Sequence, residues 1–479
     1  MKFWIKIISI VLAAMLALGL MAGCNFVREE TEWDRVMAEM IEEIDFDADS
    51  SYTGELVVAR NAESGEVKNL TAFIESFNKK YPNIKVTQRE IPSSVYGETL
   101  KKENSAANNS GDYSDMFDVF WTAENDMPVY AVLEMLVPLE YLDEADENFS
   151  TDGLVENMVK DSSSEGHLFV MPRDYNQIVM YYNADILAEA GVEEPPTDRA
   201  LTAEEFRAML VRIREHFPLE SGVWPLDAYW NWESLFWAYL KSFGGELLVS
   251  DSSGALSSNL ASEESYAAYK YLKELNIDTL IPAAGQTALG QFSAGNAAFG
   301  FHSRAVLTGM LDADMVDNVG VAPLPQFGDT YTIGAGCSGY GMYRYAPHKT
   351  EAWLFLKHIV SEEGQEAFGR TGNGIPVLQS QLEDPNAGWR SFTHENLLAD
   401  FDSEVYVFAK DTAATSTRDY KDLIRTDQVG DIKDEFESSV QYVLNYTDSQ
   451  NYLADSSNRK SMYYYLELAD KRIDRVLAR

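Results

Sequence analysis

An apolar run, a helical pattern and a second apolar run follow one another between residues 56 and 87. The first run begins at Leu56, and apolar residues then recur at helical spacing from Val67 until Pro82 ends the pattern. Residues 84–87 supply the second run, and residues 116–121 are predicted as a further strand. Strand, helix and strand in this order predict a parallel sheet with helices on its faces, so the sequence indicates an α/β fold.

Two helices are predicted farther along the chain. Thr202 and Glu205 have the spacing of a capping box, and apolar residues at helical spacing follow them. Residues 351–368 are predicted to form one amphipathic helix.

The first 23 residues have the pattern of an export signal. Lys2 and Lys6 precede an apolar run at 7–20, which is shorter than the roughly 20 residues that a membrane span needs. The run leads to Cys24 through a segment that resembles the bacterial lipobox. We therefore expect Cys24 to be the site of lipid attachment, which would hold the protein at the extracellular face of the bacterial cell membrane. Residues 24–51 are rich in carboxylates and are predicted to form a solvated acidic tether.

Charge and cysteine usage exclude several classes of function. The chain has 38 Lys and Arg against 77 Asp and Glu, a net charge of −39, which disfavours binding to the phosphates of nucleic acids. With Cys24 assigned to lipid, Cys337 is the one cysteine left, so neither a disulfide framework nor a cysteine-rich zinc site can form. The six histidines are scattered along the chain, and we expect neither a metal nor a cofactor.

Sequence signatures of catalysis fail at the positions that they require. Glycines at 334, 336 and 339 match a dinucleotide-binding fingerprint, but no helical pattern follows and Ile359 stands where an acid is needed. His394 and Glu395 are followed by Leu398 where a zinc peptidase has its second histidine. A pair of carboxylates for glycoside hydrolysis stays open, because only their separation in space tests it.

Ligand contacts are expected beyond the carboxyl ends of strands, where open α/β sheets bind their ligands. Sugar recognition combines a flat aromatic surface with planar polar groups, and Tyr229 and Trp230 are predicted to supply such a surface. Trp232 shares a helical face with Phe236 and Tyr239 and is predicted to pack in the core. The candidate ligand-binding residues are Trp121, Glu124, Asp126, Arg173, Tyr175, Tyr229, Trp230, His302, Arg304, Ser338 and Asn373.

A series of short segments resembles, in its order, the family 1 extracellular solute-binding proteins of ABC transporters, which are mostly sugar binders related to maltose-binding protein. The resemblance extends from about Gly54 to Val377. Its segments are Phe77-Asn78-Lys79-Lys80-Tyr81-Pro82-Asn83-Ile84-Lys85-Val86, Asp118-Val119-Phe120-Trp121, Leu136-Val137-Pro138-Leu139, Tyr181-Tyr182-Asn183-Ala184-Asp185 with Ala190-Gly191-Val192, Ser242-Phe243-Gly244-Gly245-Glu246, Phe292-Ser293-Ala294-Gly295-Asn296-Ala297-Ala298, Glu351-Ala352-Trp353-Leu354-Phe355-Leu356, Ser361-Glu362-Glu363-Gly364-Gln365 and Ile375-Pro376-Val377.

This resemblance implies a two-lobed, periplasmic-binding-protein-like fold of type 2 topology with crossing hinge strands. It places the first lobe at residues 52–171 and 336–392, and the second lobe at residues 172–335 and 393–479. It further implies a monomer that captures a sugar or oligosaccharide between its lobes and delivers it to the permease subunits of an ABC importer, without enzymatic activity. A surface-anchored glycan-cleaving enzyme is the alternative interpretation.

Overall fold

The computed structural model describes residues 31–282, 289–445 and 461–479. The predicted export signal and Cys24 lie outside the described residues. The chain divides into two compact units, Met1–Glu43 and Ile44–Arg479, and each is described by itself.

The described part of the first unit is helix α2 (Glu32–Glu43), which lies within the predicted acidic tether. The backbone N–H of Asp34 donates to Thr31 Oγ1 at 3.1 Å, and Asp34 Oδ2 accepts from the backbone N–H of Thr31 at 2.7 Å. These reciprocal bonds satisfy backbone donors at the helix start, as in a capping box. The sequence analysis did not anticipate this helix.

The second unit contains a five-stranded sheet in the order β2-β1-β3-β15-β6. Strand β1 (Gly54–Asn61) pairs in parallel with β2 (Ile84–Ile91) and with β3 (Val119–Ala123). Strand β15 (Ser338–Met342) runs antiparallel to β3 and to β6 (Met171–Pro172). Helix α3 (Ser64–Lys80) connects β1 to β2, so the predicted strand, helix and strand are confirmed.

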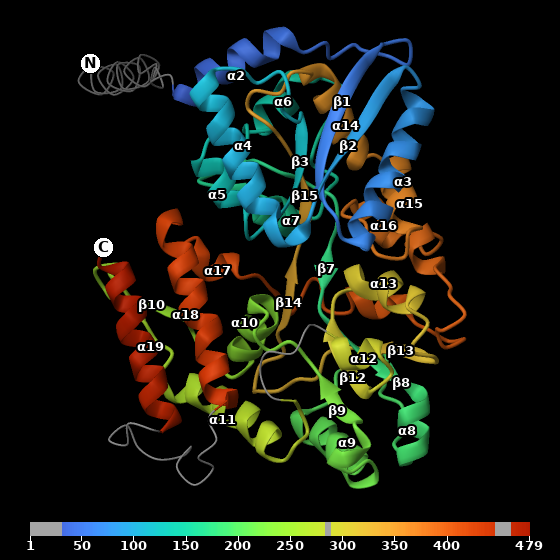
Figure 1. Ribbon diagram of the computed structural model, residues 1–479, viewed down its shortest axis with the longest axis vertical. Helices are drawn as coiled ribbons and strands as arrows, with labels where there is room; N and C mark the ends of the chain where they lie inside the picture. Colours follow the sequence, from blue (N-terminus) through green and yellow to red (C-terminus); the bar gives the residue numbers. More distant parts are fainter. Residues whose placement is uncertain (1–30, 283–288, 446–460) are drawn as a thin grey trace, which may run out of the picture. The chain divides into compact units, whose positions relative to one another are not determined.

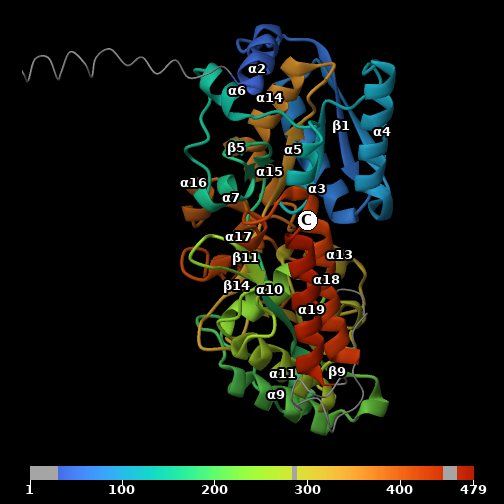
Figure 2. The same cartoon turned by 90° about the vertical axis from the view of Figure 1, so that its left-hand side faces the viewer.

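Helices cover both faces of this first sheet (Figure 1). Helix α4 (Tyr96–Ser110) and helix α14 (Lys349–Ile359) lie on opposite sides of β1 in Figure 2. The single helix predicted at 351–368 is in fact two helices, because α14 ends and Ser361 caps α15 (Glu362–Gly369) by accepting from the backbone N–H of Gly364 at 3.1 Å.

A second, four-stranded sheet has the order β13-β8-β12-β9. Its strands are β13 (Val319–Ala322), β8 (Val179–Asn183), β12 (Ala297–His302) and β9 (Trp224–Asp227). Helix α9 (Ala203–His216) begins with the predicted capping box between Thr202 and Glu205. The other long helices of this part are α10 (Glu233–Ser242), α11 (Glu263–Ile277), α18 (Thr426–Asn445) and α19 (Met462–Leu477).

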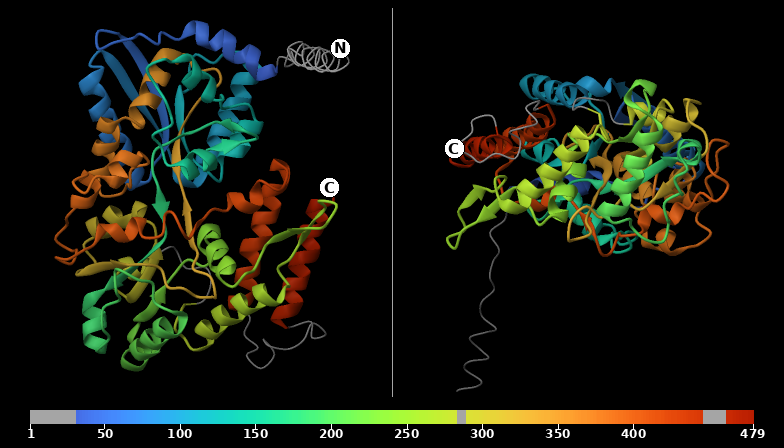
Figure 3. Two further views of the ribbon diagram at one scale, coloured as in Figure 1. Left: turned by 180° about the vertical axis from the view of Figure 1, so that it is seen from behind. Right: turned by 90° about the horizontal axis from the view of Figure 1, so that it is seen from below.

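An aromatic and aliphatic core holds these helices against the second sheet. Phe236 of α10 packs against Tyr269 of α11 and Phe436 of α18, with ring centroids 5.0 and 5.4 Å apart. Helices α18 and α19 pack against each other, as the red helices of Figure 3 show. Within the described part of the chain, no helix is both long enough and apolar enough to cross a membrane.

Two chain segments run between the two sheets. One leads from β6 through β7 (Asn176–Gln177) to β8, and the other leads from β14 (Ile333–Gly336) to β15. Strands β7 and β14 pair with each other in antiparallel register, and β16 (Ala414–Thr415) pairs in parallel with β14. The connection between the sheets therefore rests on a short strand pair.

Candidate functional site

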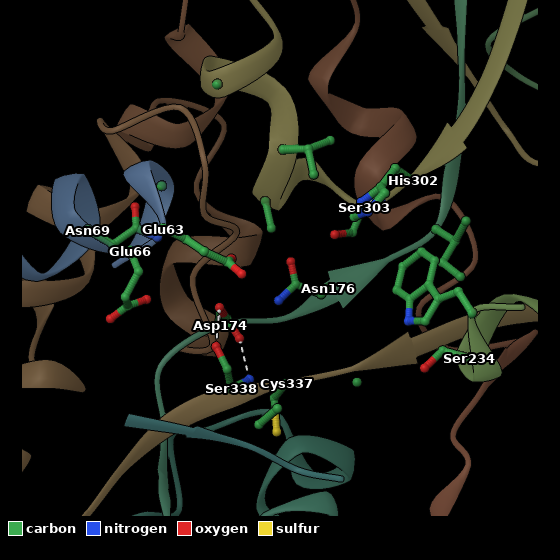
Figure 4. Close-up of a pocket in the computed structure, with 18 of the residues that line it drawn as sticks. Glu63, Glu66, Asn69, Asp174, Asn176, Ser234, His302, Ser303, Cys337 and Ser338 are labelled. Carbon is green, nitrogen blue, oxygen red and sulfur yellow. Dashed lines mark hydrogen bonds between the residues drawn. The ribbon is translucent and has the colours of Figure 1, made fainter. Parts of the chain in front are cut away.

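A cavity of about 820 Å³ lies where the first sheet, the crossing strands and the second sheet meet. Its walls come from residues far apart in the sequence. Its lining includes Asn61, Glu63, Glu66, Asn69, Trp121, Glu124, Asn125, Arg173, Asp174, Asn176, Tyr229, Trp232, Ser234, His302, Ser303 and Ser338. Figure 4 shows Glu63, Glu66 and Asn69 at the left of the cavity, His302 and Ser234 at the right, and Asn176 between them.

The first-sheet wall lies beyond the carboxyl ends of two parallel strands, where α/β sheets bind their ligands. Asn61 ends β1, and its Oδ1 accepts from the backbone N–H of Glu63 at 3.0 Å. Trp121 lies in β3, with Tyr96 edge-on to its indole at a centroid distance of 5.9 Å. The buried Nε1 of Trp121 has no hydrogen-bond partner among the described residues.

The second-sheet wall carries a second tryptophan. Trp232 is the residue before α10, and its indole stacks on His302 at a centroid distance of 4.6 Å and an interplanar angle of 25°. Burial lowers the pKa of His302 to about 4, and its Nδ1 accepts from the backbone N–H of Ser303 at 2.9 Å. His302 is therefore a neutral imidazole at physiological pH, with its proton on Nε2.

A buried ionic cluster lies at the crossing strand that leaves β6. Arg173 Nη1 donates to Glu66 Oε2 at 2.5 Å, and Arg173 Nε donates to Asp174 Oδ2 at 3.2 Å. The backbone N–H of Ser338 donates to Asp174 Oδ1 at 2.7 Å, and the Ser338 hydroxyl donates to Asp174 Oδ2 at 3.0 Å (Figure 4). Burial opposes the charge of Arg173, but Glu66 and Asp174 raise its pKa, so the cation persists in this site.

Glu124 follows β3 and lines the cavity. Burial and the neighbouring Asp161 raise its pKa to about 8, although Lys421 opposes the shift. The Glu124 carboxyl is therefore mostly protonated at neutral pH and can donate a hydrogen bond.

Six of the predicted residues line the cavity, namely Trp121, Glu124, Arg173, Tyr229, His302 and Ser338. Whether they contact a ligand stays a prediction. Five others, Asp126, Tyr175, Trp230, Arg304 and Asn373, are not among the lining residues.

Each of these five residues has another environment. Asp126 is exposed at the start of α5 (Met127–Val132). The Tyr175 side chain is buried, and its hydroxyl donates to Gln177 Oε1 at 3.0 Å. Trp230 is 3% exposed, with its ring 5.0 Å from that of Tyr239.

Arg304 and Asn373 are buried and join separate chain segments. Arg304 Nε and Nη2 donate to the backbone carbonyls of Gly372 and Trp389 at 2.9 and 2.6 Å. Asn373 Oδ1 accepts from the hydroxyl of Thr308 at 2.6 Å. These contacts stabilise the fold around the cavity.

The sequence analysis misplaced one tryptophan and missed several polar residues. Trp230, predicted to face the ligand, lies in the core. Trp232, predicted for the core, packs against it but also lines the cavity. Trp232 precedes the first residue of α10, so the helical spacing of α10 does not determine the direction of its side chain. The missed polar lining residues include Glu66, Asn69, Asn125, Asp174, Asn176 and Ser234. Glu66 and Asn69 lie in the first turns of α3, just after the carboxyl end of β1. Their position after a predicted strand could have identified them as candidates.

Metal coordination has no geometric support in the described part of the chain, where no group of three or more His, Cys, Asp or Glu side chains has a suitable arrangement. The buried Cys337 thiol contacts Ser162 Oγ at 3.3 Å, and burial raises its pKa, so it is a poor nucleophile.

Comparisons with known proteins agree with this architecture. A Brucella abortus protein is 25% identical over 360 residues, which cover 68% of this chain and 80% of that protein. The ABC substrate-binding protein Lmo0181 from Listeria monocytogenes, solved with cycloalternan, has a TM-score of 0.69 at 18% identity and covers 89% of this chain and 100% of its own. UgpB from Mycobacterium tuberculosis, solved with glycerophosphocholine, has a TM-score of 0.69 at 16% identity, covering 88% of this chain and 98% of its own.

A third solved structure, the GacH receptor of Streptomyces glaucescens, has a TM-score of 0.66 at 18% identity and covers 89% of this chain and 99% of its own. These similarities show a two-lobed, periplasmic-binding-protein-like fold, with one sheet in each lobe. The sequence model of the bacterial extracellular solute-binding proteins matches residues 72–391, about two thirds of the chain. The chain therefore belongs to the family of bacterial extracellular solute-binding proteins.

Proposed function

We propose that this protein captures a sugar or oligosaccharide in the cavity between its two sheets and delivers it to an ABC importer. The observation that carries this proposal is the pair of tryptophans in the cavity wall, Trp121 from the first sheet and Trp232 beside the second. An indole face matches the apolar face of a pyranose ring, and nearby amides and hydroxyls can bond its hydroxyl groups. The volume of about 820 Å³ is in the range of small-molecule sites and can hold more than one sugar ring.

The ligands of similar proteins support a saccharide. Lmo0181 was solved with cycloalternan, and the GacH receptor was studied in complex with acarbose. UgpB was solved with glycerophosphocholine, a ligand that is not a saccharide.

The residues that we propose to contact the ligand are the six predicted residues that line the cavity, together with Trp232, Asn125 and Asn176. We also propose the lobe boundaries given above, because the chain crosses between the sheets on either side of β7 and between β14 and β15. The C-terminal helices α18 and α19 accordingly count with the second lobe.

A thermal-shift screen over a panel of saccharides tests the function. A ligand at 100 times its Kd should add about 2.7 kcal/mol to the free energy of unfolding. Chromatography of the released ligand then distinguishes a binding protein from a glycan-cleaving enzyme. Recovery of the intact saccharide supports binding, and the appearance of shorter products supports the enzyme. Failure of every saccharide to raise the melting temperature would contradict the proposed ligand class.

We propose in addition that lipid on Cys24 anchors the protein at the extracellular face of the cell membrane, where it works as a monomer with the permease subunits of the importer. Cys24→Ala should move the protein from the membrane fraction to the medium or the soluble fraction. Membrane association that is unchanged in Cys24→Ala would show that the apolar segment, not the lipid, holds the protein.

A further inference from the structure

The cavity lining carries more carboxyl groups than basic groups. Four carboxyl side chains face it, from Glu63, Glu66, Glu124 and Asp174, and Arg173 is the one Lys or Arg among the described lining residues. Glu124 is mostly protonated at neutral pH, so the negative charge comes from the other three. A charged ligand in the cavity interacts with these side chains more strongly than it would in water, because the cleft is partly desolvated.

The charge of Arg173 is balanced within the protein. Its guanidinium is bonded to both Glu66 and Asp174, and its side chain is 6% exposed. It also lies over the rings of Tyr340 and Phe368, at 5.7 and 5.6 Å from their centroids. An incoming carboxylate or phosphate would lie beside two carboxylates that already pair with this one guanidinium, so a third negative charge is unfavourable there.

Helix α3 offers no anion site either. The N-terminus of a helix attracts anions through its free backbone N–H groups and its dipole. In α3, Glu63 is the residue before the helix and Glu66 lies in its first turn, so two carboxylates already stand at this N-terminus. A second anion from the ligand would meet their charge.

The other basic side chains near the cavity are either uncharged or already bonded to groups of the protein. His302 is uncharged at physiological pH because burial lowers its pKa to about 4. Lys421, close to the cavity, donates to Glu233 Oε2 at 2.8 Å and to Asn125 Oδ1 at 2.6 Å. Arg304 is 1% exposed and lies outside the cavity lining, with Nε and Nη2 bonded to two backbone carbonyls.

We infer that this site selects its ligand by charge: it accepts uncharged and amine-bearing saccharides and rejects those that carry carboxylate, phosphate or sulfate groups. This inference rests on the saccharide-binding function proposed above and narrows it. The neutral amides and hydroxyls of Asn61, Asn69, Asn176 and Ser234 bond sugar hydroxyls regardless of charge. Glu63 lies outside the ionic cluster of Arg173, Glu66 and Asp174, and its carboxyl group can receive a ligand ammonium group.

Matched saccharides test this selection. Oligosaccharides with the same ring stereochemistry and linkage would be compared as neutral, 2-amino and uronic acid forms, by calorimetric titration at low ionic strength and pH 7. For each set whose neutral form binds, the amine should bind at least as tightly, and the uronate at least tenfold more weakly. A uronate or sugar phosphate that binds as tightly as the neutral form would overturn the inference without affecting the proposed function.

Two variants locate the effect. Glu63→Gln removes one carboxylate from the wall and should reduce the discrimination against the uronate. Glu215→Gln changes an exposed residue of α9 outside the cavity lining and serves as the matched control, with discrimination unchanged. Equal effects of the two variants would show that the net charge of the whole protein, not the wall, repels the anion.

A measurement without sugar keeps the inference testable if no saccharide binds, in which case the proposed function fails. Iodide and caesium quench tryptophan fluorescence with opposite charge, and the cavity signal is obtained by difference from Trp121→Phe and Trp232→Phe. Relative to free tryptophanamide, iodide should quench these indoles less than caesium does, and Glu63→Gln should increase the iodide quenching. Equal relative quenching by both ions would overturn the inference.

Discussion

Trp230 and Trp232 are two positions apart and have opposite environments. The Trp230 ring packs among those of Tyr239, Phe301 and Phe327 at centroid distances of 5.0, 6.0 and 6.1 Å. The Trp232 ring instead lines the cavity. Trp230 lies in a turn in which the backbone N–H of Trp232 donates to the carbonyl of Tyr229 at 2.8 Å. Because the chain changes direction in this turn, the two indoles do not share a face, as residues two positions apart in a strand would.

Truncation of these tryptophans should separate binding from stability. Trp121→Ala and Trp232→Ala should lower ligand affinity at least tenfold, about 2 kcal/mol or more as expected for an anchor residue, with a small change in melting temperature. Trp230→Ala, the matched control, should cost about 3–5 kcal/mol of folding stability because it opens a cavity in the core. Ligand titration and thermal unfolding of the three variants are the measurements.

The opposite pattern would contradict this assignment. If Trp121→Ala and Trp232→Ala lose most of their melting temperature, both indoles are structural. If all three variants bind with the affinity of the unchanged protein, the cavity is not the ligand site.

Buried carboxyl groups beside the cavity should make stability depend on pH. Burial raises the pKa of Asp161, which ends α7 (Glu156–Asp161), to about 7, and that of Glu124 to about 8. Both groups have pKa values near 4 in the unfolded chain, so between about pH 4 and 8 the folded state binds more protons. Their contribution to stability is thus complete below about pH 4 and is lost as the pH rises through 7 to 8.

Urea unfolding at pH 5.5 and pH 8 measures this contribution. We expect a lower free energy of unfolding at pH 8, with a slope of up to about 1.4 kcal/mol per pH unit for each group that titrates fully. Asp161→Asn should flatten the dependence on pH. A slope that is identical in Asp161→Asn would show that other groups cause it.

At the scale of elements, helix α17 (Arg418–Lys421) fixes a loop of the cavity wall. Asn125 Oδ1 accepts from the hydroxyl of Thr417 at 2.7 Å and from Lys421 Nζ at 2.6 Å. Lys421 Nζ also pairs with Glu233 of α10 at 2.8 Å, and both side chains are 2% exposed. Since two donors occupy its oxygen, Asn125 can offer a ligand only the N–H groups of its amide.

Disrupting this contact should weaken binding through Asn125. Lys421→Met should cost about 3–5 kcal/mol of stability, because it leaves Glu233 buried without its partner. Lys421→Met combined with Glu233→Leu removes both charges and should recover most of that stability, while ligand affinity stays reduced because Asn125 loses a donor that orients it. Urea unfolding and ligand titration check both effects. A stable double variant with unchanged affinity would show that α17 has no part in binding.

Local patterns in the sequence predicted many elements but not their contacts. The alternation of apolar runs and helical spacing identified β1, α3 and β2, and Thr202 with Glu205 marked the start of α9, because these signals lie within a few residues. The split between α14 and α15 depends on one cap at Ser361 inside a continuous apolar pattern. The contact of Lys421 with Asn125 joins residues almost 300 positions apart, and no local pattern encodes it.

The site was predictable to a similar extent. Trp121 and Glu124 line the cavity as expected, because Trp121 lies in a recognisable strand and Glu124 directly follows its carboxyl end. Arg304 and Asn373 also lie beside turns and strand ends, but their side chains bond to other segments of the protein instead of facing the cavity. Side-chain direction at such positions depends on tertiary packing.

At the scale of the whole second unit, the two sheets are connected by few hydrogen-bonded strands. Strands β7 and β14 pair over two residues each, and β16 adds a short parallel partner to β14. Other contacts near this connection include those of Arg304 with Gly372 and of Thr308 with Asn373. A change of a few backbone dihedrals in such segments can rotate one lobe against the other, which is the usual form of hinge motion.

A ligand that contacts both walls should therefore favour the conformation in which the lobes are closest. Trp121 belongs to one wall and Trp232 to the other, so a sugar that stacks on both binds the closed conformation better and shifts the equilibrium toward it. Small-angle scattering should show a smaller radius of gyration at saturating ligand. Trp121→Ala at the same ligand concentration is the control and should show little decrease, because one of the two contacts is missing. An unchanged radius for the unaltered protein, with calorimetry showing saturation, would mean that the ligand binds without closing the lobes, and the two tryptophans would then act independently.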